Sequence, residues 1–214
     1  MKHRTEGSPG GAPDYRLHAP AAAKNRDPIL KLIGRIAPAN ASIFEVGSGS
    51  GEHAVYIAGH LPQIVWQPSD PDPTMRASIA GWIAHTRVAN VRPPLDIDCE
   101  SEDWCRLVPM VPDLILAINF THIVGQLVLD GLLAGAGRLL RRDGLLALYG
   151  PFRFNGDYTS NSNKSFDHML FQQNRAWGLR DLNNIAAGAA PHGLELQEIA
   201  AMPSHNHTLV LRRR

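Results

Sequence analysis

Three glycines at alternate positions, Gly47, Gly49 and Gly51, follow an apolar run that ends at the acid Glu45. Glycines spaced in this way let the backbone adopt positive φ, and they let a ligand approach the main chain closely. In open α/β sheets such a turn joins the first strand to the next helix and binds a nucleotide-type cofactor. The sequence therefore predicts a cofactor site at this turn. The residues assigned to it are Glu45, Gly47, Ser48, Gly49, Gly51 and His53.

The spacing of the turn favours S-adenosylmethionine over NAD. Dinucleotide sites use G-x-G-x-x-G, and at the position of the third glycine this chain has Glu52. A dinucleotide needs backbone N–H groups for its pyrophosphate, whereas S-adenosylmethionine carries a sulfonium and an ammonium that suit a nearby carboxylate such as Glu45. Asp70 ends the next apolar run and is predicted to bind ribose hydroxyls, a role that NAD sites share.

Length, composition and charge limit the class of protein. The chain has 214 residues, 44% hydrophobic and 19% charged, which is enough for one substantial core and favours a single domain. Its formal net charge is +1, and the charges are interspersed except for 212–214, so no nucleic-acid partner is expected. The apolar runs are strand-length and the first 20 residues lack a secretory pattern, so we expect no membrane partner and a cytoplasmic location.

Cysteine and histidine provide no convincing metal site. Cys99 and Cys105 do not form a C-x-x-C motif, and we interpret them as free thiols in a reducing compartment. His205 and His207 alternate on a predicted strand and would share one face, but a third ligand is missing. We therefore predict that the protein holds no metal.

Strand and helix patterns alternate along most of the chain. Residues 1–19 are rich in glycine and proline and are predicted to be a flexible tail, with one domain over 20–214. Alternating strands and helices predict an α/β fold with a parallel sheet and helices on both faces. The predicted strands are 42–47, 64–69, 91–95, 113–119, 144–149, 194–200 and 207–212, the last two forming a hairpin. The predicted helices are 21–36, 51–60, 73–86, 101–107, 126–141, 163–174 and 179–190.

Several short motifs together resemble one known family. They are segments 19–30, 45–53, 66–70, 149–152, 177–181 and 202–203. In combination these motifs resemble the DUF938 family, the methyltransferase-like 26 proteins, over about 19–213. The resemblance implies a Rossmann-like class I S-adenosylmethionine-dependent methyltransferase fold, in which a seven-stranded, mostly parallel sheet ends in an antiparallel hairpin. It also implies S-adenosyl-L-methionine as cofactor, and it does not supply a methyl acceptor.

The resemblance extends the cofactor site beyond the glycine turn. It places Asp96 on the acid that faces the adenine amino group, although a solvated loop acid is the alternative. It places Asn119 at the end of the fourth strand, where methyltransferases of this class put residues that face the methionine portion and the transferred methyl. The family usually has His-Ile-Ser-Pro-Trp after this strand, whereas this chain has His-Ile-Val-Gly-Gln at 122–126. Because of this difference, the family's acceptor pocket does not carry over directly to this chain, whereas the cofactor turn matches the family.

Four further residues are candidates for binding the acceptor. Asn25 and Arg26 are hypothesised to form part of a lid over the cofactor or acceptor, with a solvated surface patch as the alternative. Asp27 is predicted to be an N-cap with Pro28 at the first helical position. The other two candidates, both aromatic, are Tyr149 and Phe152.

Methyl transfer from a sulfonium requires alignment and, for some acceptors, removal of a proton. Histidine suits that proton transfer at neutral pH, so His122 is the candidate general base beside Asn119, with an expected pKa of about 6.5. We expect His53 to pack against the fold or cap its helix rather than to react.

The prolines of Asn-Pro-Pro-Tyr, typical of nucleic-acid methyltransferases, are missing after Asn119, which favours a small molecule or a protein side chain as acceptor. The alternatives are a non-catalytic S-adenosylmethionine-binding module and an NAD(P)-dependent oxidoreductase; the oligomeric state stays open.

Overall fold

The computed structural model describes residues 14–214, which form two compact units that meet in sequence between Ile97 and Asp98. The predicted tail, residues 1–19, lies largely outside the described residues. Its last part makes specific contacts, because Leu17 N donates to Ser78 Oγ at 2.8 Å and Trp82 Nε1 donates to Leu17 O at 3.0 Å. Ala19 N donates to Glu52.

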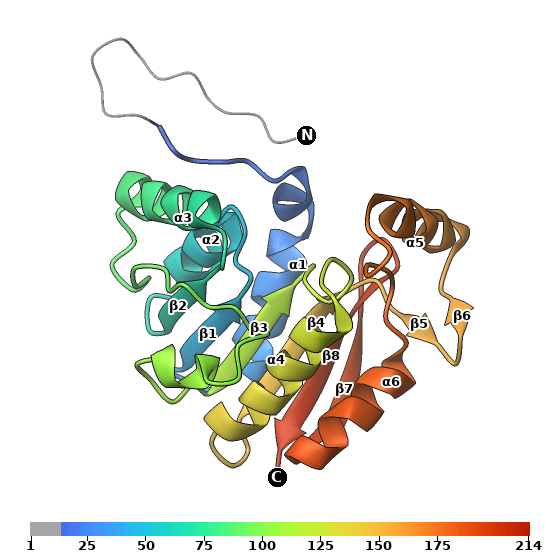
Figure 1. Cartoon of the computed structure of the whole chain (residues 1–214). Helices are drawn as coiled ribbons and strands as arrows, with labels where there is room; N and C mark the ends of the chain where they lie inside the picture. The colour runs from blue at the N-terminus through green and yellow to red at the C-terminus, as the bar shows by residue number, and fades with distance from the viewer. Residues whose placement is uncertain (1–13) are drawn as a thin grey trace. The chain divides into compact units, whose positions relative to one another are not determined.

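The N-terminal unit contains two parallel strands and three helices (Figure 1). Strands β1 and β2 pair in parallel from Ser42 opposite Val65 to Val46 opposite Ser69. All residues of both strands except the first are buried, as expected for strands covered on both faces. The elements are α1 (Pro20–Ile36), β1 (Ser42–Val46), α2 (Glu52–His60), β2 (Val65–Ser69) and α3 (Pro73–Thr86).

The predicted strand at 91–95 is not formed. Val91 and Leu95 make only isolated bridges to Trp66 and Ser69. Pro93 and the proline after it have no N–H group, so a continuous hydrogen-bonded ladder cannot run through this segment.

The start of α1 also differs from one expectation. The helix begins at Pro20, close to the predicted 21–36, and it continues through Pro28. Asp27 therefore lies inside the helix, so the predicted N-cap is wrong; its Oδ1 instead accepts a hydrogen bond from the Tyr56 hydroxyl. The apolar stripe of α1, which includes Ile29 and Ile33, outweighs the helix-breaking tendency of the proline.

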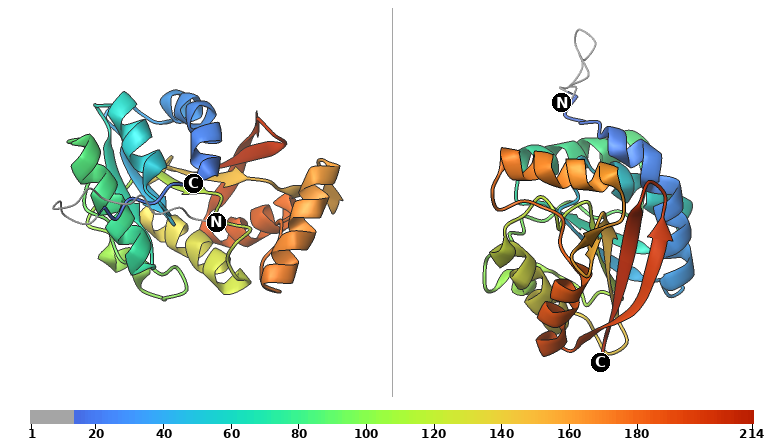
Figure 2. Two further views of the ribbon diagram at one scale, coloured as in Figure 1. Left: turned by 90° about the horizontal axis from the view of Figure 1, so that it is seen from above. Right: turned by 90° about the vertical axis from the view of Figure 1, so that its right-hand side faces the viewer.

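The C-terminal unit contains four long strands in the order β3, β4, β8 and β7. β3 and β4 are parallel, whereas β8 is antiparallel to both β4 and β7. Figure 2 (right) shows α4 and α6 on the same side of the β7–β8 hairpin. The elements are β3 (Leu114–Ile118), α4 (Gln126–Leu139), β4 (Leu145–Gly150), β5 (Arg153–Phe154), β6 (Asp157–Tyr158), α5 (Asn161–Gln173), α6 (Leu182–Ala189), β7 (Leu194–Met202) and β8 (Asn206–Arg213), with short 3-10 turns at Trp104–Leu107 and Ala190–His192.

The predicted α/β fold with mostly parallel strands and a C-terminal antiparallel hairpin is confirmed. Residues 14–214 contain six long strands rather than seven, because the 91–95 strand is missing. The predicted helix at 101–107 is only a 3-10 turn, and the loop 150–162 contains the short β5–β6 hairpin. No helix in the described part of the chain is long and apolar enough to cross a membrane.

Candidate functional site

The glycine turn follows β1 in the N-terminal unit, as predicted. Gly47, Gly49 and Gly51 have φ of 64°, 58° and 90°. A Cβ on Gly51 would lie 2.8 Å from the Ile79 Cα, so this glycine is required for packing against α3. A Cβ on Gly49 would meet no atom within 4 Å, so this part of the turn presents an open backbone surface. The turn thus combines one glycine needed for packing with one whose face is accessible to a ligand.

Asp70 is fixed against this turn by backbone donors. Gly49 N donates to Asp70 Oδ2 at 2.9 Å, and Asp72 N donates to Oδ1 at 3.0 Å. The guanidinium of Arg76 donates to the Asp70 carbonyl oxygen at 2.9 Å, and its other terminal nitrogen lies 2.9 Å from a carboxylate oxygen of Asp96. Arg76 therefore links the backbone of Asp70 to the carboxylate of Asp96. Sequence reasoning missed this residue because it lies on α3 rather than in a motif.

Other N–H groups of the turn are also used within the protein. Ser48 N donates to Ser69 O at 2.8 Å, and Gly51 N donates to Ser48 O at 3.1 Å. Together with the bond from Gly49 to Asp70, these contacts occupy backbone donors that a pyrophosphate would need. The turn therefore has few free backbone N–H donors, and two carboxyl groups, those of Glu45 and Asp70, lie beside it.

Glu45 is buried directly before the turn. Burial raises the pKa of its carboxyl to about 7, and the nearby charge of Asp70 acts in the same direction. Hydrogen bonds from Ser48 and from the indole of Trp66, at 3.0 Å, partly oppose that rise. Glu45 can therefore change its charge near neutral pH when a cation binds beside it.

His53 and Asn25 contact each other rather than an open surface. His53 Nε2 lies 2.7 Å from Asn25 Oδ1, joining α2 to α1, and both side chains are buried. Burial lowers the pKa of His53 to about 4, and the charge of Arg26 adds to that effect. The neutral ring therefore donates to the amide oxygen, which is a packing contact of the kind expected for His53.

Arg26 lies over the ring of Tyr56, with 4.2 Å between its guanidinium carbon and the ring centroid. It lines a cavity of about 350 Å³ with Glu52 and Trp82. In this structure the Asn25 side chain is hydrogen-bonded to His53. The lid roles of Asn25 and Arg26 stay predictions.

In the C-terminal unit, the residue directly after β3 has a left-handed backbone conformation. Asn119 has φ of 52°, and its N–H donates to Tyr149 O at 2.9 Å. The loop that follows is held by Arg180, whose guanidinium donates to the carbonyl oxygens of Thr121, Val124 and Ala176. A single side chain thus fixes the backbone that carries His122. Arg180 belongs to a motif noted in the sequence, but only the structure gives it this role.

His122 lies in that loop with 4% of its surface exposed, and its ring packs edge-on against Phe166 at 5.5 Å. The pKa of His122 is lowered to about 4, chiefly by burial; the charge of Arg180 acts in the same direction, and Asp167 opposes both. The expected value near 6.5 is therefore wrong, because the ring is buried and lies near the Arg180 charge. His122 is neutral at physiological pH.

The structure brings His122 and Asn119 together over Gly150. A Cβ on Gly150 would lie 3.4 Å from His122 Nδ1 and 4.0 Å from Asn119 Oδ1. Tyr149 and Phe152 are 1% and 0% exposed, so their side chains lie in the core in this structure. The acceptor role predicted for these two aromatics stays untested.

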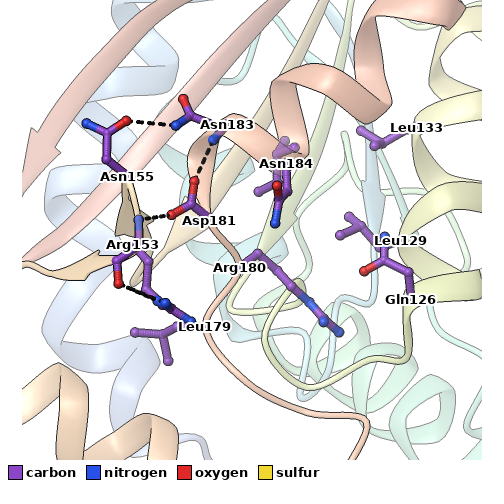
Figure 3. A pocket seen from close by; sticks show the side chains of 12 residues that line it. Gln126, Leu129, Leu133, Arg153, Asn155, Leu179, Arg180, Asp181, Asn183 and Asn184 are labelled. Carbon is purple, nitrogen blue, oxygen red and sulfur yellow. Dashed lines mark hydrogen bonds between the residues drawn. The ribbon is translucent and has the colours of Figure 1, made fainter.

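A cavity of about 570 Å³ lies between α4, β5 and the start of α6 (Figure 3). Its polar wall is a network in which Asp181 accepts from Gly156 N at 2.6 Å and from Asn183 N at 2.9 Å, while Asn183 donates to Asn155. Arg180 forms part of the same wall. The network stabilises the segment from which Arg180 reaches the loop after β3.

The histidines and cysteines considered as metal ligands all lie within the described residues. Among residues 14–214 no three His, Cys, Asp or Glu side chains gather in a way that could hold a metal ion. His205 lies in the β7–β8 turn with φ of 58°, so it does not alternate with His207 along a strand as expected. Cys99 and Cys105 are free.

Solved structures of several methyltransferases have a similar fold. An O-methyltransferase family protein from Burkholderia thailandensis has a TM-score of 0.74 at 16% identity, covering 87% of this chain and 55% of that chain. The S-adenosylmethionine-dependent methyltransferase SibL has a TM-score of 0.74 at 17% identity, covering 90% and 55%. CalO1, a methyltransferase in calicheamicin biosynthesis solved with SAH (S-adenosylhomocysteine) bound, has a TM-score of 0.71 at 17% identity, covering 91% and 54%. The chain therefore has the fold of S-adenosylmethionine-dependent methyltransferases, and it spans little more than half the length of these proteins.

The chain belongs to DUF938, a family described as a protein of unknown function, whose model matches residues 16–213.

Proposed function

We propose that this protein is an S-adenosylmethionine-dependent methyltransferase whose acceptor is a small molecule or a protein side chain. The observation that carries the proposal is the hydrogen bond from Gly49 N to the carboxylate of Asp70 beside an open backbone surface. Asp70 is thereby oriented to accept hydrogen bonds from ribose hydroxyls. The same bond removes a donor that a dinucleotide phosphate would require, which argues against an NAD(P)-dependent oxidoreductase.

The other cofactor contacts follow from the chemistry of the ligand. Glu45, ionised on binding, would attract the positively charged methionine portion of the cofactor. Asp96, which is mostly exposed and paired with Arg76, is proposed to face the adenine amino group. The turn residues Gly47, Ser48 and Gly51 shape the backbone surface. Asn119 is proposed to face the transferred methyl.

The reaction requires alignment more than covalent chemistry. Methyl transfer forms a bond from the acceptor atom to the methyl carbon as the carbon–sulfur bond breaks, and alignment supplies much of the rate. If the acceptor atom carries a proton, His122 is the proposed base. Its neutral ring is able to accept a proton throughout the physiological pH range.

Nucleic acid is not the acceptor that we propose. The basic run at the C-terminus is largely neutralised within the fold, because Arg212 pairs with Asp143 and Arg214 pairs with Glu195. Phosphate contacts normally dominate the affinity of nucleic-acid-binding proteins. Filter binding with mixed nucleic acids at low and moderate salt tests this point, and tight binding that falls steeply with salt would contradict it.

A methyl-transfer screen tests the proposed function. The protein is incubated with S-adenosylmethionine carrying a labelled methyl group and with separate metabolite, protein and nucleic-acid fractions. We expect label in the metabolite or the protein fraction, and we expect Gly49→Val to abolish it. Cofactor binding without transfer to any fraction would instead indicate a non-catalytic binding module.

A further inference from the structure

Two buried histidine nitrogens in the C-terminal unit have no hydrogen-bond partner among the described residues. They are His122 Nδ1 and His207 Nδ1. Most buried polar atoms in proteins are hydrogen-bonded, so two unpaired ring nitrogens in one unit require a physical explanation. His122 is itself 4% exposed, and so its hydrogen-bonding capacity is directed into the interior.

The sheet register brings both histidines next to the same glycine. Gly150 is paired with His207 across β4 and β8, and directly opposite residues of an antiparallel pair project from the same face about 4.5–5.5 Å apart at Cβ. The position of a Cβ on Gly150 lies 3.4 Å from His122 Nδ1. Thr208 pairs with Tyr149 and therefore projects from the opposite face. His122 and His207 thus flank the space over Gly150, and Asn119 Oδ1 borders it.

The charges around this space select a neutral ligand group. Burial lowers the pKa of both histidines, helped by Arg180 for His122 and by His205 for His207, so both rings are uncharged near neutral pH. Arg180 is engaged with three carbonyl oxygens. Asp167, which faces His122, already accepts from the Tyr158 hydroxyl and from Leu179 N. No cation is therefore placed for a carboxylate ligand, and the nearby acid is engaged elsewhere.

Two neutral imidazoles can offer one acceptor nitrogen and one N–H donor. A hydroxyl group matches that pair because it donates one hydrogen bond and accepts others. A carboxylate would instead require both rings as donors, and an ammonium group would require both as acceptors. The tautomers of neutral imidazoles permit either arrangement, but neither charged group would meet a free counter-charge at this site.

We propose that His207 binds the methyl acceptor together with His122 over Gly150, and that the acceptor atom is a hydroxyl oxygen. This inference rests on the proposed methyltransferase function. His207 Nδ1–H donates to the hydroxyl oxygen and holds it, while the hydroxyl donates to His122 Nδ1. As the oxygen–methyl bond forms and the carbon–sulfur bond breaks, the hydroxyl proton passes to His122. The sulfonium becomes the neutral thioether of SAH, and the positive charge passes to the imidazolium, which then releases its proton to solvent.

Three variants test the roles of the space and of the ring nitrogen. His207→Phe keeps an aromatic ring against Phe154, which the His207 ring contacts at 4.8 Å, but it removes both nitrogens. Gly150→Ala puts a methyl group into the space at van der Waals distance from His122. The matched control is His205→Asn, because His205 lies in the adjoining turn at positive φ, which asparagine tolerates.

The probes are ring compounds that carry a single hydroxyl, amino or carboxyl group on the same set of scaffolds, with SAH formation as the readout. S-adenosylmethionine affinity is measured in parallel by calorimetry. We expect turnover of the hydroxyl compounds only. We also expect a loss of about tenfold or more in kcat/KM for His207→Phe and Gly150→Ala, with unchanged cofactor affinity. His205→Asn should match the wild-type protein.

Preference for amino or carboxyl compounds, or wild-type turnover by His207→Phe, would overturn the inference. Cofactor binding without turnover of any hydroxyl compound would overturn it too, while leaving the cofactor site in place. Failure of the wild-type protein to bind S-adenosylmethionine would instead overturn the proposed function itself.

Discussion

The glycine turn of the N-terminal unit and the space over Gly150 in the C-terminal unit are built in opposite ways. In the turn, the backbone N–H groups of Ser48, Gly49 and Gly51 all have partners within the protein. Over Gly150, two ring nitrogens have none among the described residues. Under the proposed function, the turn would bind the cofactor through an open backbone surface and fixed carboxylates, whereas the second region would offer its unpaired nitrogens to the reacting atom.

The two regions share one electrostatic property. Burial raises the pKa of Glu45 to about 7 and lowers that of His122 to about 4, so it favours the neutral form in each case. With a pKa of about 7 the Glu45 carboxyl is about half ionised at neutral pH, and a bound cation would favour its charged form. His122 becomes charged only when it receives a proton. Under the proposed function, these charge changes would accompany cofactor binding and methyl transfer.

The largest expected effect is on turnover, in the second region. His122→Asn keeps a polar atom near the Nδ1 position but cannot act as a base, so turnover of the acceptor found by the screen should fall by about 10²–10⁴-fold. S-adenosylmethionine affinity should change by no more than a few-fold. Because the pKa is about 4, wild-type turnover should not rise between pH 6 and 8 through His122 ionisation. Near-normal turnover by the variant would remove His122 from the mechanism.

Paired glycine variants separate packing from binding within the turn. Gly51→Ala forces a methyl group against Ile79 at positive φ, which should cost about 2–5 kcal/mol of stability. Gly49→Ala meets no atom, so it should cost only the backbone strain of about 1–2 kcal/mol but should weaken cofactor binding. Gly49→Val should weaken binding further. Denaturant unfolding and calorimetry measure the two effects, and equal losses of stability and affinity at Gly49 would indicate a purely structural glycine.

A pH series tests the buried histidines. The pKa of His53 is lowered from its usual value of 6.5 to about 4, so between these pH values the unfolded chain binds a proton that the folded chain does not. Stability from this group is therefore present above pH 6.5 and is lost on acidification, by up to about 3 kcal/mol at pH 4. His122 acts in the same direction. Glu45 has the opposite sign, because its raised pKa makes its contribution decrease as the pH rises from 4.5 to 7.

His53→Gln keeps a donor near the Nε2 position for Asn25 and removes the titration. The rise in the free energy of unfolding from pH 4 to 6.5 should therefore be smaller in this variant than in the wild-type protein. His60→Gln, at the exposed end of α2, is the matched control. An unchanged pH dependence in His53→Gln would show that His53 is not held in its neutral form.

The smallest expected effect concerns the ribose contact. Charge-assisted hydrogen bonds contribute about 1.5–3 kcal/mol each, so Asp70→Ala should weaken S-adenosylmethionine binding by about tenfold or more. Asp72→Ala is the control, since it removes the N-cap bond to Thr74 N and should lower stability by about 1 kcal/mol without changing affinity. Unchanged affinity of a folded Asp70→Ala protein would show that another residue holds the ribose.

The comparison also explains what could be predicted from the sequence. The glycine turn is local, because Glu45 and the three glycines are contiguous and the strand before them is apolar, so both its fold and its position were predictable. The position of Asp70 was also predictable, because it lies directly after the next strand. The prediction of a strand at 91–95 was wrong because two consecutive prolines interrupt the hydrogen bonding of this segment.

The second region could be predicted only in part. His122 and Asn119 were placed near each other because both follow one strand. The low pKa of His122 depends on Phe166 and Arg180, which are distant in sequence and come close only through folding. His207 reaches the same space through the register of β8 against Gly150, which no local pattern specifies.

Calorimetric titration with S-adenosylmethionine, SAH and NAD tests the central claim most directly. The turn has carboxylates beside an open backbone surface and uses its own N–H donors internally. We therefore predict saturable heats with S-adenosylmethionine and SAH and none with NAD. Heat with NAD alone would contradict the assignment of this turn to a methyl-donor cofactor.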